Sequence, residues 1–277
     1  MYVKTILFSK NVIIYIDFLS KNVIKRKIDK YLIDWKNSKN RKPLIIKGAR
    51  QIGKTTSIEK FGKENYTSFI EINYVSMPQF KQIFQDGYTP DKVIKNISLL
   101  NSEYKFIPGE TLLFFDEMQE YPDTATSLKF FHEDGKYDVI CSESLMGINY
   151  NQIHSNSVGN KEDYIMRSLD FEEYLWAKGY NEEQIEDLYT CMKEVKPLTN
   201  TQYKVMMSNF KDYLITGGMP EIVTTFIENK NFSGILSQQQ KLLMDYEEDI
   251  TKYSGGLDKS KILDAYKKIK IFLGNDK

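Results

Sequence analysis

Cysteine and histidine are scarce in this sequence. Its 277 residues include two cysteines, Cys141 and Cys191, and two histidines, His132 and His154. So few and so widely separated cysteines build neither a disulfide framework nor a thiolate zinc site, and they indicate reduced thiols in a cytoplasmic protein. Two histidines give little support to a histidine zinc centre or to a histidine-activated nucleophile. Metal chemistry beyond Mg²⁺ is therefore not expected.

A surplus of charge of either sign is also missing, because 38 Lys and Arg residues balance 38 Asp and Glu residues. Proteins that attract nucleic acid through their overall field carry a basic surplus, so the net charge gives no support to that class. No apolar run reaches the roughly 18 residues of a transmembrane helix. We therefore expect no membrane segment.

Residues 1–23 form an atypical N-terminal extension. Lys10 and Asp17 interrupt its apolar character, and the small-residue cleavage site of a signal peptide is missing. Three interpretations stay open for this extension. It is a strand or helix packed on the core, a disordered segment, or a segment in contact with a membrane.

The most informative segment is the run GARQIGKT at 48–55. It matches G-x-x-x-x-G-K-[ST], the phosphate-binding loop called Walker A, in which backbone N–H groups surround phosphate oxygens. The following helix presents its positive end to the same anion. We expect Lys54 to reach the β- and γ-phosphates, and the Thr55 hydroxyl to bind Mg²⁺. The predicted nucleotide-binding residues are Gly48, Ala49, Arg50, Gln51, Ile52, Gly53, Lys54, Thr55 and Thr56.

The residues on both sides of this loop support the interpretation. An apolar run at 43–47 predicts a buried strand, and residues 56–61 predict a helix that ends at Gly62. Strand, loop and helix is the order that the motif requires. The alternative, a glycine-containing surface turn, does not explain that order.

Strands and helical segments alternate over the first two thirds of the chain. Further strands are predicted at 67–74, 111–115, 137–141 and 164–166, and helical segments at 24–36, at 79–104 with a break near Gly87 and Pro90, and at 126–132. This alternation predicts an α/β fold, the doubly wound parallel sheet of P-loop NTPases, followed by a helical lid or C-terminal region. The helix at 24–36 has a basic side, which is a solvated face or, alternatively, a patch for DNA.

After Leu169 the periodicity is almost wholly helical. We expect three parts: the extension at 1–23, a P-loop ATPase core at 24–180, and a helical lid with the start of a truncated C-terminal domain at 181–277. A turn, GGMPE at 217–221, opens one helix with Pro220 at its first position. Turn chemistry explains this pattern, and the alternative places Pro220 against an adenine ring.

Two acids, Asp116 and Glu117, end the apolar strand at 111–115 in a Walker B pattern. Because the ends of parallel strands carry the ligand site, the pair is expected to face the phosphate loop. Asp116 would hold Mg²⁺, and Glu117 would orient and help deprotonate the attacking water. Ser142, after the next strand, is the predicted γ-phosphate sensor; otherwise it caps local backbone. The predicted catalytic residues are thus Glu117, Lys54 and Ser142.

Together these segments resemble a family of bacterial and archaeal AAA+-like P-loop ATPases. The resemblance rests on GARQIGKT at 48–55, LLFFDEMQ at 112–119, CSESLMG at 141–147, LDFEEYLWAKG at 169–179 and GGMPE at 217–221. It implies an ATPase core, a helical lid whose Gly-x-Pro element lies near adenine, and a further C-terminal domain of uncertain role. It implies no defined substrate.

Two departures from the family pattern bear on function. Glu143 stands where the family usually has Gly, and a carboxylate beside the γ-phosphate would weaken binding or slow hydrolysis. Family members also usually run well past the end of this chain, which makes a truncated gene product an expectation. The sequence therefore predicts a cytoplasmic, Mg²⁺-dependent ATPase or ATP-driven switch. The alternatives are a nucleotide-binding module with impaired hydrolysis and a DNA- or partner-binding regulator gated by ATP.

Overall fold

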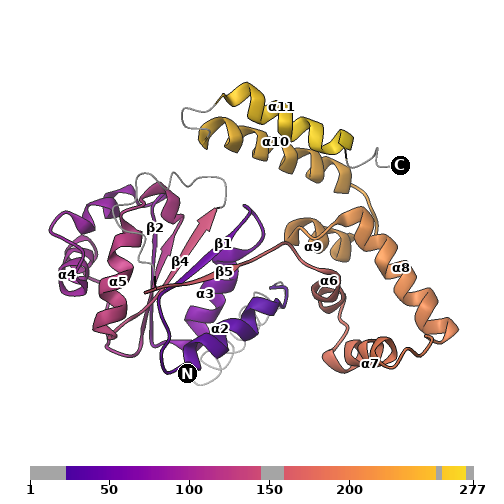
Figure 1. Ribbon diagram of the computed structural model, residues 1–277, viewed down its shortest axis with the longest axis horizontal. Coiled ribbons are helices and arrows are strands. Elements are labelled where there is room, and N and C mark those ends of the chain that lie inside the picture. The colour runs from indigo at the N-terminus through magenta and orange to yellow at the C-terminus, as the bar shows by residue number, and fades with distance from the viewer. Residues whose placement is uncertain (1–22, 145–158, 254–257, 273–277) are drawn as a thin grey trace, which may run out of the picture. The chain divides into compact units, whose positions relative to one another are not determined.

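The computed structural model describes residues 23–144, 159–253 and 258–272 (Figure 1). The chain forms two compact units. The first, which we call the sheet unit, comprises Leu32–Arg167 and Leu236–Lys277. The second, the helical unit, comprises Met1–Tyr31 and Ser168–Ile235. The extension expected at 1–23 lies almost entirely outside the described residues, and the domain boundary expected near residue 180 stays a prediction.

The sheet unit contains five parallel strands in the order β2-β3-β4-β1-β5. They are β1 (Leu44–Gly48), β2 (Ser68–Asn73), β3 (Thr111–Asp116), β4 (Asp138–Ser144) and β5 (Glu162–Ile165). The helices of this unit are α3 (Lys54–Asn65), α4 (Pro90–Leu100), α5 (Thr124–Asp134), α10 (Ile235–Tyr253) and α11 (Lys259–Phe272), with the short 3-10 helices η1 (Pro78–Phe84) and η2 (Met118–Glu120). The predicted α/β fold with a parallel sheet is confirmed.

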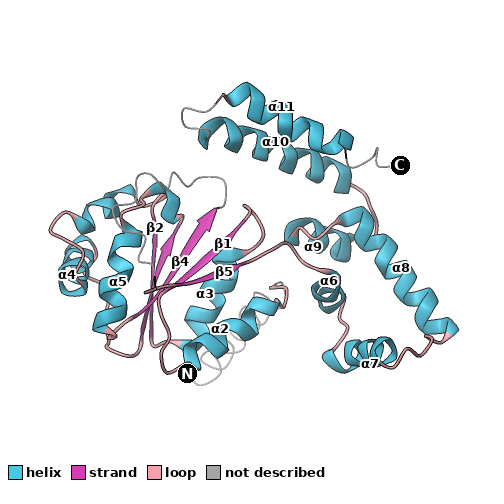
Figure 2. Cartoon of the chain, in the orientation of Figure 1, coloured by secondary structure: helices cyan, strands magenta, loops and turns pink. Residues whose placement is uncertain are grey.

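Helices cover both faces of the sheet, α4 and α5 on one side and α3 on the other (Figure 2). Every residue of β3 is buried, and the apolar run Leu112–Phe115 at its centre is typical of a strand covered on both faces. The main core lies between the sheet and the α4–α5 side, where Ile72, Leu113, Phe115 and Cys141 are buried together. This arrangement leaves the carboxyl ends of the strands at one edge, where a ligand site of a parallel sheet forms.

The helix after the phosphate loop is longer than the sequence predicts. Helix α3 continues through Gly62 to Asn65 and is capped at Tyr66, so the expected end at Gly62 is wrong. A Cβ atom at Gly62 would lie 2.2 Å from the Phe69 ring of β2. Glycine is therefore required at this position by the close approach of helix and strand rather than by a helix end.

The helical unit contains α6 (Phe171–Ala177), α7 (Glu182–Lys193), α8 (Asn200–Thr216) and α9 (Pro220–Asn229), while α2 (Lys27–Asn37) begins in it and continues into the sheet unit. The helices α6, α7 and α8 each begin with a reciprocal capping box, which satisfies their first backbone N–H groups. No described helix has both the length and the apolar character for crossing a membrane.

Candidate nucleotide-binding site

The loop at 48–55 joins β1 to α3 through two left-handed backbone positions. Gln51 has a φ of 62° and Gly53 a φ of 91°, which turns the chain directly into the first turn of α3. A Cβ atom at Gly48 would lie 2.4 Å from the Met166 carbonyl oxygen, so only glycine fits beside that backbone. The predicted order of strand, loop and helix is confirmed. Thr56 is exposed on the first turn of α3.

The Lys54 ammonium lies within the loop. It donates hydrogen bonds to the carbonyl oxygens of Gly48 at 2.9 Å and Ala49 at 2.7 Å. Burial lowers the pKa of Lys54, while the carboxylates of Glu117 and Asp116 oppose that shift. The Lys54 ammonium is thus buried and interacts electrostatically with both acids, while its contact with phosphates stays a prediction.

Thr55 and Asp116 meet at the head of α3. The Thr55 hydroxyl oxygen lies 3.2 Å from each carboxylate oxygen of Asp116, which is itself buried. A hydroxyl and a carboxylate are hard oxygen ligands of the kind that Mg²⁺ takes together with water and phosphate oxygens. The two residues predicted to hold a metal ion are therefore brought together with suitable donor atoms.

Ser142 lies on β4, the strand between the one that leads into the loop and the one that ends in Asp116. Its hydroxyl donates to Asp116 Oδ1 and accepts the Glu117 backbone N–H at 3.2 Å. The sequence places Ser142 after a strand, but β4 extends to Ser144 because it pairs with β1 as far as Gly48. In this position Ser142 orients the acid pair, and its contact with a γ-phosphate stays a prediction.

Glu117 has a left-handed backbone, with a φ of 57°. Gln119 Nε2 donates to its carboxylate, and Gln119 Oε1 accepts the backbone N–H of Ser144 at 3.1 Å. Gln119 therefore fixes the acid to the end of β4. Gln119 is the last residue of the segment LLFFDEMQ, and this glutamine close behind the acid pair is the sequence signal for a role that was not predicted.

Asn73, at the carboxyl end of β2, is a second residue of the site for which the sequence predicts no role. Its Nδ2 donates to Asp116 Oδ2 at 2.8 Å. The sequence signal was a polar residue ending the strand beside β3, where Asn73 pairs in register with Asp116. This contact could be predicted only from the order of the strands in the sheet, which local sequence patterns do not give.

Glu143 does not share a sheet face with Ser142, because successive strand residues point to opposite faces. It pairs in register with Lys47 of β1 and is 2% exposed. Burial raises its pKa to about 7, against the opposing effect of Lys47 and Lys161. The strand geometry therefore puts this carboxylate on the sheet face opposite Ser142, but it still interacts electrostatically with Lys54, and its approach to a γ-phosphate stays a prediction.

Arg50 and Gln51, two polar residues of the loop, contact helix α10. Arg50 Nη1 forms an ion pair with Asp249, and Gln51 Nε2 donates to Asp245 Oδ2 at 2.9 Å. The Tyr246 hydroxyl donates to the Arg50 carbonyl oxygen at 3.1 Å. Arg50 is among the residues predicted to bind nucleotide, and in this structure its partner is Asp249, an acid far along the chain.

Pro220 begins α9 in the helical unit. The preceding turn is tight, because a Cβ atom at Gly218 would lie 2.1 Å from the Leu169 carbonyl oxygen. Leu169 N–H in turn donates to the Gly218 carbonyl at 2.7 Å. These contacts explain the glycine before Pro220, and the proximity of Pro220 to adenine stays a prediction.

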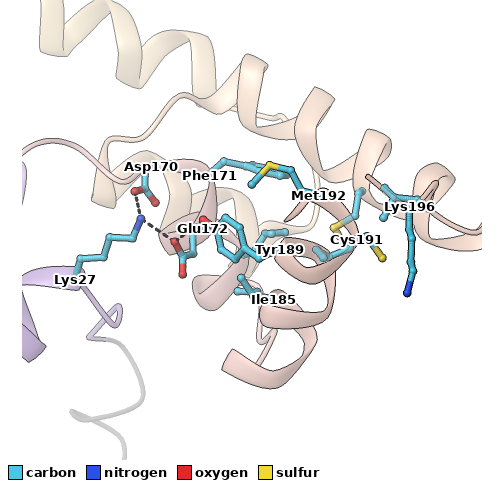
Figure 3. A pocket seen from close by; sticks show the side chains of 13 residues that line it. Lys27, Asp170, Phe171, Glu172, Ile185, Tyr189, Cys191, Met192 and Lys196 are labelled. Carbon is cyan, nitrogen blue, oxygen red and sulfur yellow. Dashed lines mark hydrogen bonds and ion pairs between the residues drawn. The ribbon is translucent and has the colours of Figure 1, made fainter. Parts of the chain in front are cut away.

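The helical unit has a separate, mostly apolar cavity of about 520 Å³ among α6, α7 and α8 (Figure 3). At one end of it Lys27 forms ion pairs with Asp170 and Glu172, while Met192 and Cys191 lie on the α7 side. No residue predicted to bind nucleotide lines this cavity.

A parallel sheet with a phosphate loop, an ammonium inside it and a threonine–aspartate pair at the head of the next helix defines a P-loop nucleotide-binding protein. Residues 40–175 match the family model described as AAA domain, and residues 207–273 match a domain of unknown function (DUF8612). Residues 40–175 thus match an AAA domain, which confirms the resemblance to AAA+-like P-loop ATPases that the motifs predict. A further C-terminal domain of uncertain role is likewise confirmed.

Several solved structures are similar to the chain. C. elegans PCH-2 is 14% identical with a TM-score of 0.43, over 76% of this chain and 64% of that chain. An alanine-to-serine mutant of Thermotoga maritima RuvB is 12% identical with a TM-score of 0.43, over 74% and 62%. Domain III of the Thermotoga maritima replication initiation protein DnaA is 15% identical with a TM-score of 0.42, over 87% and 93%. The chain spans less than two thirds of the first two. No curated protein matches its sequence.

Proposed function

We propose that the sheet unit binds ATP together with Mg²⁺ at the 48–55 loop and hydrolyses it. The observation that carries this proposal is the Thr55–Asp116 pair, with a separation of 3.2 Å between the hydroxyl and both carboxylate oxygens. This pair lies at the N-terminus of α3, where backbone N–H groups and the helix dipole favour a phosphate group.

Each residue of the site has a distinct part in the proposed reaction. Lys54 binds the β- and γ-phosphates, and Thr55 with Asp116 holds Mg²⁺, which supplies charge neutralisation at the phosphate oxygens. Glu117 orients the attacking water and accepts its proton. Asn73 and Gln119 keep the two acids in place through their amide groups. Substitution of Lys54, Thr55 or Asp116 should therefore weaken nucleotide or Mg²⁺ binding, whereas substitution of Glu117 should slow hydrolysis.

The test compares wild type with Lys54→Ala and Glu117→Gln, using Lys63→Ala on the exposed side of α3 as the charge control. We expect ATP at about 100 times its dissociation constant to raise the melting temperature of wild type and Lys63→Ala by about 5 to 10 °C. Lys54→Ala should lose this shift. Glu117→Gln should keep it but lose phosphate release. Equal background release from all four proteins would remove hydrolysis from the proposal.

One contact favours a second candidate, a nucleotide-binding module with impaired hydrolysis. The Glu117 carboxylate accepts a hydrogen bond from Gln119, which ties up the group that would receive a proton. In that case ATP stabilises wild type without measurable phosphate release, and Gln119→Ala releases the acid and raises turnover. Phosphate release by wild type that falls in Gln119→Ala contradicts this candidate.

The cytoplasm as location and an ATP-gated protein or DNA partner belong to the same proposal. Both cysteines are free, and Cys141 is fully buried, which agrees with a reducing compartment. On the basic helix α2, Lys27 is already paired with Asp170 and Glu172. This engagement favours a protein partner over DNA, and a DNA mobility shift that weakens with salt would reverse that preference.

A further inference from the structure

Helix α10 contacts the phosphate loop with one side of its surface. Asp245, Tyr246 and Asp249 lie at helix positions that share a face, since residues four apart are neighbours. Asp249 pairs with Arg50, Asp245 accepts from Gln51, and Tyr246 donates to the backbone between them. The side chains of Arg50 and Gln51 therefore contact the same helix.

In these contacts a carboxylate of α10, that of Asp249, occupies a basic side chain of the phosphate loop. Asp249 is 5% exposed, and one of its carboxylate oxygens, Oδ2, is buried without a hydrogen-bond partner among the described residues. A buried carboxylate with one unsatisfied oxygen is an expensive arrangement unless a cation holds it. The cation that holds Asp249 is Arg50, a residue of the loop itself.

The same helix also contacts the segment after the Walker B acids. Lys252 Nζ lies 3.3 Å from Glu120 Oε1 in η2. Burial raises the pKa of Tyr246, with Tyr266 of α11 adding to the effect, so the Tyr246 hydroxyl keeps its proton and can donate to the loop. Helix α10 is therefore connected to both motifs of the nucleotide site.

We propose that α10 is an internal anionic latch on the phosphate loop, and that bound nucleotide displaces the Asp249 carboxylate from Arg50. A triphosphate brings negative charge to the same basic side chain, so the two anions compete. By linkage, ATP binding then favours release of α10, and release of α10 favours ATP binding. This inference rests on the proposed function, because it requires that the loop binds nucleotide.

The apparent ATP affinity is the intrinsic affinity multiplied by the fraction of molecules in which the loop is open, so the latch lowers it. If the latched form outnumbers the open form ten to one, its removal should tighten ATP binding about ten-fold. Asp249→Asn removes the charge and keeps the shape of the side chain. Tyr246→Phe removes only the hydroxyl and serves as a second variant should Asp249→Asn fold poorly.

The control is Glu248→Gln, which removes the same charge from the next position of the same helix. Glu248 is exposed on α10. ATP dissociation constants are measured by titration for all four proteins. Hydrogen exchange of the α10 amides is measured for each with and without ATP.

We expect Asp249→Asn to bind ATP at least five-fold more tightly than wild type, Tyr246→Phe to change in the same direction by less, and Glu248→Gln to stay within two-fold. ATP should speed hydrogen exchange in α10 of wild type. Equal effects of Asp249→Asn and Glu248→Gln, or weaker binding by Asp249→Asn, would overturn the latch.

The two proposals fail in different ways. If wild type binds ATP, but α10 exchange does not change and Asp249→Asn has no effect, the latch is wrong and nucleotide binding stands. If wild type and all variants lack ATP binding, nucleotide binding itself is wrong. Binding by Asp249→Asn alone would support both, because the latch then closes the site in wild type.

Discussion

Asn73 Nδ2 lies 2.8 Å from Asp116 Oδ2, across neighbouring strands of the sheet. The amide oxygen of Asn73 accepts the backbone N–H groups of Val75 and Ser76, each at 2.9 Å. The side chain is therefore fixed at both ends, and it holds the aspartate beside Thr55. A residue outside both nucleotide motifs thus sets the orientation of the acid that we propose to bind Mg²⁺.

We predict that Asn73→Ala weakens Mg²⁺ activation of ATP hydrolysis by about 10- to 100-fold, the usual effect of losing a residue that orients a metal ligand. The measurement is phosphate release as a function of Mg²⁺ at fixed ATP. Asn73→Asp should be at least as impaired, because it puts a like charge beside Asp116. Unchanged Mg²⁺ dependence in both variants, with normal melting temperatures, would show that Asn73 has no such role.

The contact of Gly62 with Phe69 gives a prediction of unusual sign. Inside a helix, Gly→Ala ordinarily stabilises by about 1 kcal/mol. Here the new Cβ atom would meet the Phe69 ring at 2.2 Å, so Gly62→Ala should destabilise the protein by about 1–3 kcal/mol in urea unfolding. In a Phe69→Ala background the same change should become neutral or stabilising. Stabilisation in wild type would refute the packing account.

Glu143 predicts a pH dependence of stability. Burial raises its pKa from an ordinary 4.5 to about 7, so the folded protein binds more protons than the unfolded chain between these values. This contribution to stability is fully present below pH 4.5 and is lost as pH rises through about 7. The Glu143→Gln variant lacks this pH-dependent loss. Its free energy of unfolding, relative to that of wild type, should therefore increase by up to about 3 kcal/mol from pH 5 to pH 8.

Urea unfolding at the two pH values checks this expectation. The control is Glu64→Gln, an exposed position on α3, whose difference from wild type should not change with pH. A constant difference between Glu143→Gln and wild type would mean that Glu143 titrates near its ordinary pKa in the folded protein.

The helical unit depends on a buried ion pair. Arg26 Nε lies 3.1 Å from Glu173 Oε1, and the two side chains are 5% and 6% exposed. Glu173 also accepts the backbone N–H of Lys27 and completes the capping box of α6. Arg26→Met should cost roughly 3–5 kcal/mol, because it leaves a buried carboxylate without its cation. Lys25→Met, at a half-exposed neighbour, should cost less than about 1 kcal/mol in the same unfolding experiment.

Local pattern was sufficient for the order of the elements and for the nucleotide motifs. The run from Leu44 to Gly48, the loop and the acids after β3 are contiguous in sequence, and each carries its own periodicity or composition. Gly62 shows the limit of that reasoning. A glycine near the end of a periodic segment indicates a helix end, and only the position of Phe69 on the next strand shows that it marks close packing.

Contacts between distant segments could not be predicted in the same way. Ser142 and Asn73 reach Asp116 because of the strand order. The local sequence patterns fit more than one strand order, so they do not predict these contacts. The pairing of Arg50 with Asp249 joins residues 199 positions apart, and each is an ordinary charged residue in its own segment. Their relationship exists only in the folded chain.

The hydrogen bonds from Lys54 to the carbonyls of Gly48 and Ala49 have a thermodynamic consequence. An ammonium has three N–H donors, so the two carbonyl bonds leave one N–H for a phosphate oxygen, and any further phosphate bond replaces a carbonyl partner. Each such further bond is an exchange of partners, so it adds less heat of association than a new contact would. In the nucleotide-free loop, these two carbonyl oxygens also keep the buried ammonium hydrogen-bonded.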